Sequence, residues 1–246
     1  FPAVALAVVL LAMSAGLWLI PTIYLYWQWW HYTRQSEGIS KAYAGKSKHC
    51  RLGNPTLRRA AFWSLPITGI LAVSSRSPAE FLFFPLKTLP VNDTVVLVCA
   101  GISAVLILLW AIEQFRAWRA GQLAVPYVLY LGSHFTIYFL AYIYMREINY
   151  GWLIINIWHN AQYILFVWLF NNRRFGGQVS PGHVFLSTIS QNGRFLLYTA
   201  TCLTISTVAY FLISRYVEPL ASAASAITAT MAGLIIYQTI NFHHYI

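Results

Sequence analysis

The chain has 246 residues, of which 59% are hydrophobic and 9% are charged. Because roughly a quarter of the residues in a soluble domain are charged, this composition excludes a soluble globular protein and predicts an integral membrane protein. Lys and Arg outnumber Asp and Glu by 16 to 6, which gives a formal net charge of +10. We attribute this charge to membrane topology and to contact with membrane lipids, and we expect no nucleic-acid partner.

Apolar runs predict an all-α fold, a polytopic transmembrane helix bundle of about seven spans with about 20 residues in each. In chain order the expected spans are 3–30, 60–75, 94–113, 123–145, 150–170, 195–214 and 221–246. We expect residues 1–246 to form a single integral membrane domain. Phe1 and Ile246 both fall in apolar runs, so the chain is expected to be truncated at both ends.

Two segments between the first three spans have distinct compositions. Residues 31–59 carry seven of the sixteen basic residues, and the positive-inside rule predicts that they form a basic cytoplasmic loop. Residues 77–93 hold three phenylalanines among three prolines, which is typical of an interfacial hairpin. The sequence therefore predicts a multi-pass membrane protein, and we expect it in the bacterial inner membrane.

Four histidines lie inside apolar spans: His134, His159, His243 and His244. A polar ring buried in hydrocarbon is costly unless it has a partner, so an intramembrane histidine cluster is a functional-site hypothesis by default. His31 follows the first span and is a further candidate that would cap the site from the cytoplasmic side.

Polar residues accompany these histidines at helical spacing. Tyr130 and Tyr138 lie four residues on either side of His134 and share its helix face. The fifth span places amides and a phenol around His159, and the seventh does the same around His243 and His244; these neighbours are Asn156, Asn160, Gln162, Tyr163, Tyr237, Gln238 and Asn241. We expect these faces to point into the bundle, because lipid cannot satisfy such groups.

The acidic residues fall in predicted loops or at span ends, which disfavours a proton relay, a cation pathway or a transporter. Neutral imidazole is a common ligand for iron, copper and zinc, and it also ligates haem. The candidate metal ligands are His134, His159, His243, His244 and His31, and Tyr163 and Asn160 are the candidate catalytic residues. Three interpretations stay open here: a metal site, haem ligation, and a hydrogen-bond network that needs no metal.

Three short segments resemble bacterial Brp/Blh-type β-carotene dioxygenases. The run Trp158-His159-Asn160-Ala161-Gln162-Tyr163-Ile164-Leu165-Phe166-Val167-Trp168 is similar to a family segment in which a histidine precedes a Phe-Val-Trp-like run. Ser133-His134-Phe135 is similar to an Ile-His-Phe segment, and Asn241-Phe242-His243 falls where a late Pro-His element stands. The resemblance implies a polytopic fold and a non-haem iron, held by His134, His159 and His243, that cleaves a carotenoid with molecular oxygen.

The chain departs from that pattern at two places. Tyr163 stands where the family has the second histidine of a His-x-x-x-His pair, and the early Pro-His-Gly element is missing. His31 or His244 would have to supply the absent ligand. The leading hypothesis is a membrane metalloenzyme, a non-haem iron oxygenase acting on a lipophilic substrate. The alternative is a non-catalytic membrane subunit that packs against membrane protein partners and ligates haem or pigment.

Overall fold

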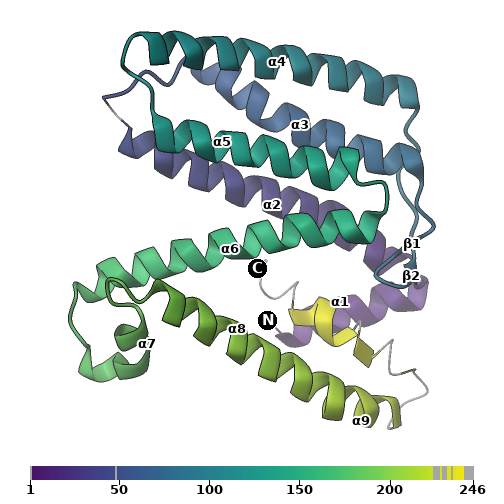
Figure 1. Ribbon diagram of the computed structural model, residues 1–246. Helices are drawn as coiled ribbons and strands as arrows, with labels where there is room; N and C mark the ends of the chain where they lie inside the picture. Colours follow the sequence, from purple (N-terminus) through teal and green to yellow (C-terminus); the bar gives the residue numbers. More distant parts are fainter. Residues whose placement is uncertain (1, 48, 224–227, 229–231, 234, 241–246) are drawn as a thin grey trace. The chain divides into compact units, whose positions relative to one another are not determined.

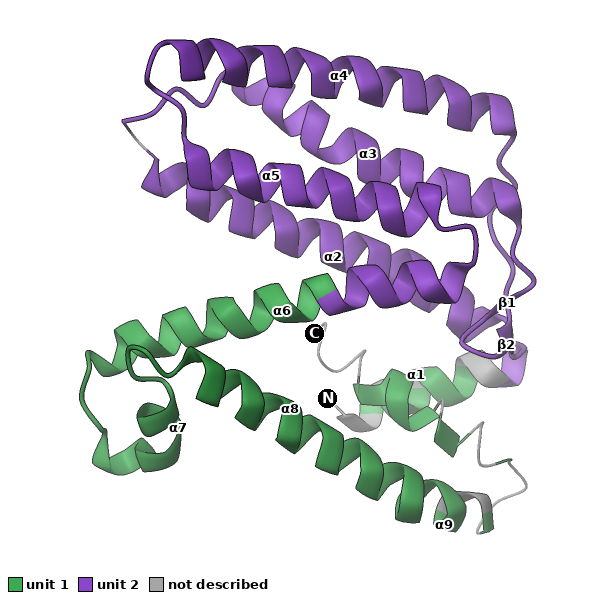
Figure 2. Ribbon diagram, viewed as in Figure 1, with its two compact units in different colours: residues 1–11, 158–246 green, residues 12–157 purple. Residues whose placement is uncertain are grey.

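The computed structural model describes residues 2–47, 49–223, 228, 232–233 and 235–240. In this part of the chain the regular secondary structure consists of helices and one short hairpin, which confirms the all-α class (Figure 1). The described residues form two compact units (Figure 2), unit 1 with residues 1–11 and 158–246 and unit 2 with residues 12–157. His243 and His244 lie outside the described residues.

The predicted first span is two helices, α1 (Pro2–Ala15) and α2 (Leu19–Lys46). The break is at Gly16, whose φ of 149° suits glycine, and a Cβ there would lie 2.8 Å from the Trp18 ring nitrogen. Helix α2 continues to Lys46, so the prediction of a loop over 31–59 was wrong for residues 31–46 and again from Pro55 onward. Opposite charges spaced three and four residues apart around Glu37 stabilise this extension.

Helix α3 (Pro55–Arg76) and helix α4 (Asp93–Arg119) pack against each other. Both begin at an asparagine cap. The Asn54 side chain accepts hydrogen bonds from the backbone N–H groups of Thr56 and Leu57, and the Asn92 side chain accepts one from Thr94. Between them, β1 (Glu80–Phe81) and β2 (Phe84–Pro85) form an antiparallel hairpin within the predicted segment 77–93. Its place at the membrane interface stays a prediction.

Helix α5 (Val125–Tyr138) passes into a π-helical segment, η1 (Phe139–Tyr144), which packs on α3. The Arg76 guanidinium, from the end of α3, donates to the backbone carbonyls of Tyr142 and Met145 and so caps the end of η1. Helix α6 (Ile148–Phe175) begins after Glu147, whose carboxylate accepts from the backbone N–H groups of Asn149 and Tyr150.

The helices of unit 2 alternate in direction. The backbone N–H of Arg51 donates to the carbonyl of Gln122 at 2.9 Å, which joins the start of α3 to the end of α4. We call this the basic end of unit 2, because it gathers the charged residues Lys41, Lys46, Arg51, Arg58, Arg59, Arg116 and Arg119. At the opposite end lie the hairpin, Arg76 and the turn at Glu147.

Unit 1 contains the later part of α6 and a series of helical segments. These are η2 (Pro181–His183), α7 (Val184–Ile189), α8 (Phe195–Leu212), η3 (Ile213–Val217) and α9 (Glu218–Ala223). Residues 232–233 and 235–240 are also helical. The predicted seventh span, 221–246, falls largely outside the described residues.

Three helices in the described part of the chain are long and apolar enough to cross a membrane: Asp93–Arg119, Ile148–Phe175 and Phe195–Leu220. This supports the membrane prediction, and it is fewer than the seven spans expected from the sequence. Helices α2 and α3 are less apolar because they carry buried polar residues, including Gln28, Thr33 and Thr68. Helix α5 has only 14 residues before η1 begins.

Candidate functional site

His134 lies on α5 with no exposed surface, inside unit 2. Its Nε2 is 3.1 Å from the backbone carbonyl of Phe62 on α3, and its Nδ1 is 2.9 Å from the hydroxyl of Ser36 on α2. A carbonyl only accepts, so Nε2 carries the proton and Nδ1 accepts the Ser36 proton. The ring stacks on Phe62 at a centroid distance of 4.0 Å. The structure thus holds a neutral imidazole engaged at both nitrogens.

The Phe62 carbonyl needs this partner because of Pro66. In a helix this carbonyl would accept from the N–H four residues later, and proline has no N–H. Phe62 and Pro66 are both buried, so water does not replace the missing donor. His134 therefore satisfies a backbone group that the α3 sequence leaves unsatisfied.

Hydroxyl groups extend this arrangement through unit 2. Tyr130 lies 2.8 Å from the Ser36 hydroxyl, and Tyr138 lies 2.9 Å from the Thr33 hydroxyl. Tyr32, which precedes Thr33 on α2, donates to the Asn156 side chain at 2.6 Å. We call His134, Ser36, Tyr130, Thr33 and Tyr138 the polar core. It confirms the predicted inward face of residues 130, 134 and 138, all of which are buried.

Of the predicted metal ligands, only His31, His134 and His159 fall within the described residues. His31 is half-buried and lies five residues before Ser36, about 140° around α2, so it faces away from the His134 ring. His159 is buried on α6, in unit 1. Among the described residues, no three His, Cys, Asp or Glu side chains lie close enough to hold a metal ion.

The two predicted catalytic residues lie on the accessible surface of α6. Tyr163 is 43% exposed and Asn160 is exposed as well, whereas His159 is buried. The prediction that all polar residues of this helix face inward was therefore wrong for these two. Adjacent helix positions are about 100° apart, so a run of neighbouring polar residues cannot share one face.

Two buried amides in unit 1 lack partners among the described residues. Both side-chain polar atoms of Gln162, on α6, are buried without a hydrogen bond. The same holds for Gln238, whose side chain has no exposed surface. Buried polar groups in native proteins nearly always have a partner in protein, water or ligand. The side-chain amides of Gln162 and Gln238 can therefore still donate and accept hydrogen bonds.

Glu37 was missed by the sequence analysis, which placed it in a loop. Its side chain is only 5% exposed, and it pairs with Arg34 at 2.8 Å, Lys41 at 3.1 Å and Arg59 at 3.5 Å. Burial raises the pKa of this carboxyl, but the hydrogen bond and charge of Lys41 and the charges of Arg34 and Arg59 outweigh it, so the net pKa is below its usual range. The signal in the sequence was the spacing of Arg34, Glu37 and Lys41 on one helix face.

Comparison with known proteins assigns no family to this chain. Searches against protein-family models, curated proteins and solved structures found no match to the chain.

Proposed function

We propose that this chain is a multi-pass membrane metalloenzyme whose histidine-ligated centre lies in unit 1 around His159. The observation that carries the proposal is the burial of His159 on a membrane-length helix, three residues before the buried and unpartnered amide of Gln162. Residues three apart lie on adjacent positions of one helix face. A neutral imidazole beside an amide is a suitable donor group for iron, copper or zinc.

His134 does not fit this role and is excluded from the proposed ligand set. Both of its ring nitrogens are already used by Ser36 and the Phe62 carbonyl, so a metal would have to displace one of them. His243 and His244, which the sequence also nominates, would complete the donor set with His159. Gln162 would orient the His159 ring or a bound substrate through its amide.

The reaction proposed is oxygenation of a lipophilic substrate that enters from the bilayer. Its support is the sequence resemblance to Brp/Blh-type dioxygenases together with the exposed apolar surfaces of the three membrane-length helices. A bound non-haem iron would supply oxygen activation. Tyr163 and Asn160, which lie on the exposed side of α6, are proposed to contact substrate and not metal.

A second candidate is a non-catalytic membrane subunit. It is favoured by the polar core, in which His134 is satisfied entirely by groups of the same chain. The broad exposed apolar surface of α4, from Leu97 to Trp118, would then face lipid or a partner subunit.

The test is the metal content of protein purified without chelator, compared among His159→Ala, His134→Ala and His49→Ala. We expect His159→Ala to lose the metal while its helix content and melting temperature stay near those of the unmutated protein. His134→Ala should keep the metal and melt at a lower temperature, and His49→Ala, at an exposed position, should change neither. Absence of metal from the unmutated protein, or full retention by His159→Ala, would reject the enzyme and favour the subunit.

A further inference from the structure

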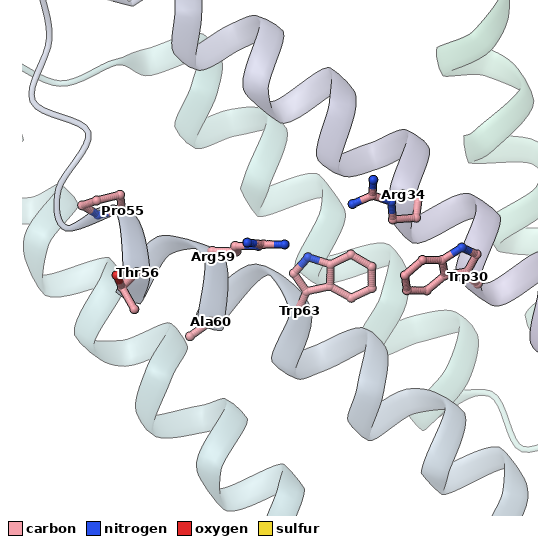
Figure 3. A pocket seen from close by; sticks show the side chains of 7 residues that line it. All are labelled: Trp30, Arg34, Pro55, Thr56, Arg59, Ala60 and Trp63. Carbon is pink, nitrogen blue, oxygen red and sulfur yellow. The ribbon is translucent and has the colours of Figure 1, made fainter.

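A basic aromatic groove opens between α2 and α3 in unit 2. Its volume is about 700 Å³, and it is lined by Trp30, Arg34, Pro55, Thr56, Arg59, Ala60 and Trp63 (Figure 3). Arg34 comes from α2 and Arg59 from α3, and their side chains point toward each other in Figure 3. The groove lies at the basic end of unit 2, where α3 begins.

The charged cluster beside this groove, which supplies its Arg34 and Arg59, has a positive balance. The buried carboxylate of Glu37 pairs with Arg34, Lys41 and Arg59, so three cations share one anion and two positive charges are uncompensated within the cluster. The cationic side chains are 49%, 68% and 70% exposed, whereas that of Glu37 is 5% exposed. The Glu37 carboxylate is therefore buried beneath the three cations, and the surplus positive charge lies on the exposed surface.

Both arginines keep donors for a second anion. Arg34 uses Nη1 and Arg59 uses Nε toward Glu37. A guanidinium carries five N–H donors, and its planar fork matches the oxygens of a phosphate. Two such groups line one groove, and their ion pairs with Glu37 fix their positions.

The aromatic wall of the groove is suited to the membrane interface. The rings of Trp30 and Trp63 lie 5.4 Å apart, and the Arg34 guanidinium lies 5.6 Å from the Trp30 ring centre. The Trp63 indole nitrogen is buried and has no hydrogen-bond partner among the described residues, whereas the Trp29 indole donates to the Pro66 carbonyl at 2.9 Å. Tryptophan is enriched where apolar and headgroup regions of a bilayer meet.

From these observations we propose that the groove binds the phosphate of an anionic phospholipid. Arg34 and Arg59 hold the phosphate oxygens, the Trp63 indole N–H donates to a phosphate or ester oxygen, and the two indole rings contact the glycerol and upper acyl chain. Anionic lipid is favoured over free phosphate because the positive charge lies directly beside the aromatic wall. Anionic headgroups are also abundant in the cytoplasmic leaflet that the basic end is predicted to face.

The experiment is native mass spectrometry of the delipidated full chain, titrated with phosphatidylglycerol, phosphatidylcholine or inorganic phosphate. The test variant is Arg34→Gln with Arg59→Gln, and its matched control is Arg116→Gln with Arg119→Gln, which removes the same charge from the same end of unit 2 outside the groove. We expect the test variant to weaken phosphatidylglycerol binding about tenfold or more, and the control to change it by less than about twofold. Neither phosphatidylcholine nor phosphate should compete at matched concentration.

Trp63→Phe provides a second measurement that leaves the ion pairs intact. Loss of one indole donor should weaken phosphatidylglycerol binding by roughly fivefold, with the melting temperature near that of the unmutated protein. Equal losses in the test and control pairs would show diffuse surface attraction and reject the site. Tight binding of inorganic phosphate, sensitive to Arg34→Gln with Arg59→Gln, would replace the lipid with a free anion.

Discussion

At the scale of single residues, Pro66 and His134 act as a pair. Proline removes one donor from α3, and a histidine from another helix supplies it at 3.1 Å. The hydroxyl of Ser36 occupies the second nitrogen at 2.9 Å, so three helices meet at one imidazole. A buried polar residue in a membrane protein is often functional. Here His134 has a structural role, because it donates to a backbone carbonyl that Pro66 leaves without a donor.

This pairing predicts that the cost of losing His134 depends on Pro66. His134→Phe should lower the free energy of unfolding by about 1–3 kcal/mol, because the Phe62 carbonyl is left buried without a donor. In a Pro66→Ala background the alanine N–H can take that carbonyl, so the same change should cost less. A double-mutant cycle measured by reversible unfolding in detergent should give a coupling of at least about 0.5 kcal/mol. Additive effects would disprove the pairing.

At the scale of elements, the ends of the helices around residue 147 are held by side chains. Arg76 caps η1 through two carbonyls, and Glu147 caps α6 through two backbone N–H groups at 3.1 and 2.8 Å. These contacts fix the reversal between η1 and α6. They also put one titratable group at the start of the helix that carries His159.

Glu147 makes the start of α6 sensitive to acid. Partial burial raises the pKa of this carboxyl, but hydrogen bonds from Asn149 and Tyr150 outweigh it, so the folded-state pKa is below its ordinary value of 4.5. A lowered carboxyl pKa contributes stability above the unfolded-state value, and that contribution is lost as the pH falls through the folded-state value. Protonation below about pH 4.5 should therefore weaken the cap.

The measurement is amide hydrogen exchange at residues 149–152 in the unmutated protein and in Glu147→Gln. At pH 7 the variant should exchange faster, by an amount typical of a lost cap, about 0.5–2 kcal/mol. The difference should shrink as the pH falls below 4.5. A difference that stays constant across this range would show that the charge of Glu147 does not carry the effect.

At the scale of the whole molecule, charge and apolar surface agree on how unit 2 meets the membrane. The basic end gathers Lys41, Lys46 and five arginines, whereas the opposite end mixes Arg76, Lys87 and Arg146 with Glu80, Asp93 and Glu147. Helix α4 joins the two ends, and only 11% of its most apolar stretch is buried. The positive-inside rule then predicts that the basic end is cytoplasmic.

Cysteine labelling in intact cells tests this orientation. In a Cys50→Ser, Cys99→Ser, Cys202→Ser background, a cysteine at exposed Gly121 should be protected from a membrane-impermeant maleimide until the cells are opened. A cysteine at exposed Arg146, in the opposite turn, should react from outside. The reverse pattern would invert the topology and would also remove the cytoplasmic leaflet from the proposal for the groove.

Sequence reasoning reached the helical class, the membrane setting, the hairpin near Phe81 and the buried face around His134, because periodicity and composition report these directly. It did not predict the hydrogen-bond partners of His134. The contact of His134 with Ser36 joins residues 98 apart, and its contact with Phe62 depends on a carbonyl that Pro66 frees in another helix. It also ended α2 too early, because the turn around Glu37 is charged in sequence, although the Glu37 carboxylate is buried in the fold and paired with Arg34 and Lys41.

The order of donors in the polar core has a consequence for proton movement. Ser36 donates to Nδ1 of His134, and His134 donates from Nε2 to the Phe62 carbonyl, while the Tyr130 hydroxyl lies 2.8 Å from the Ser36 hydroxyl and also donates to the Ser36 carbonyl. A proton wire must let each member pass a proton on and then receive another, and an amide carbonyl at its terminus has none to give. Along these contacts the line ends at the Phe62 carbonyl, so they join α2, α3 and α5 and give a proton no onward route from His134.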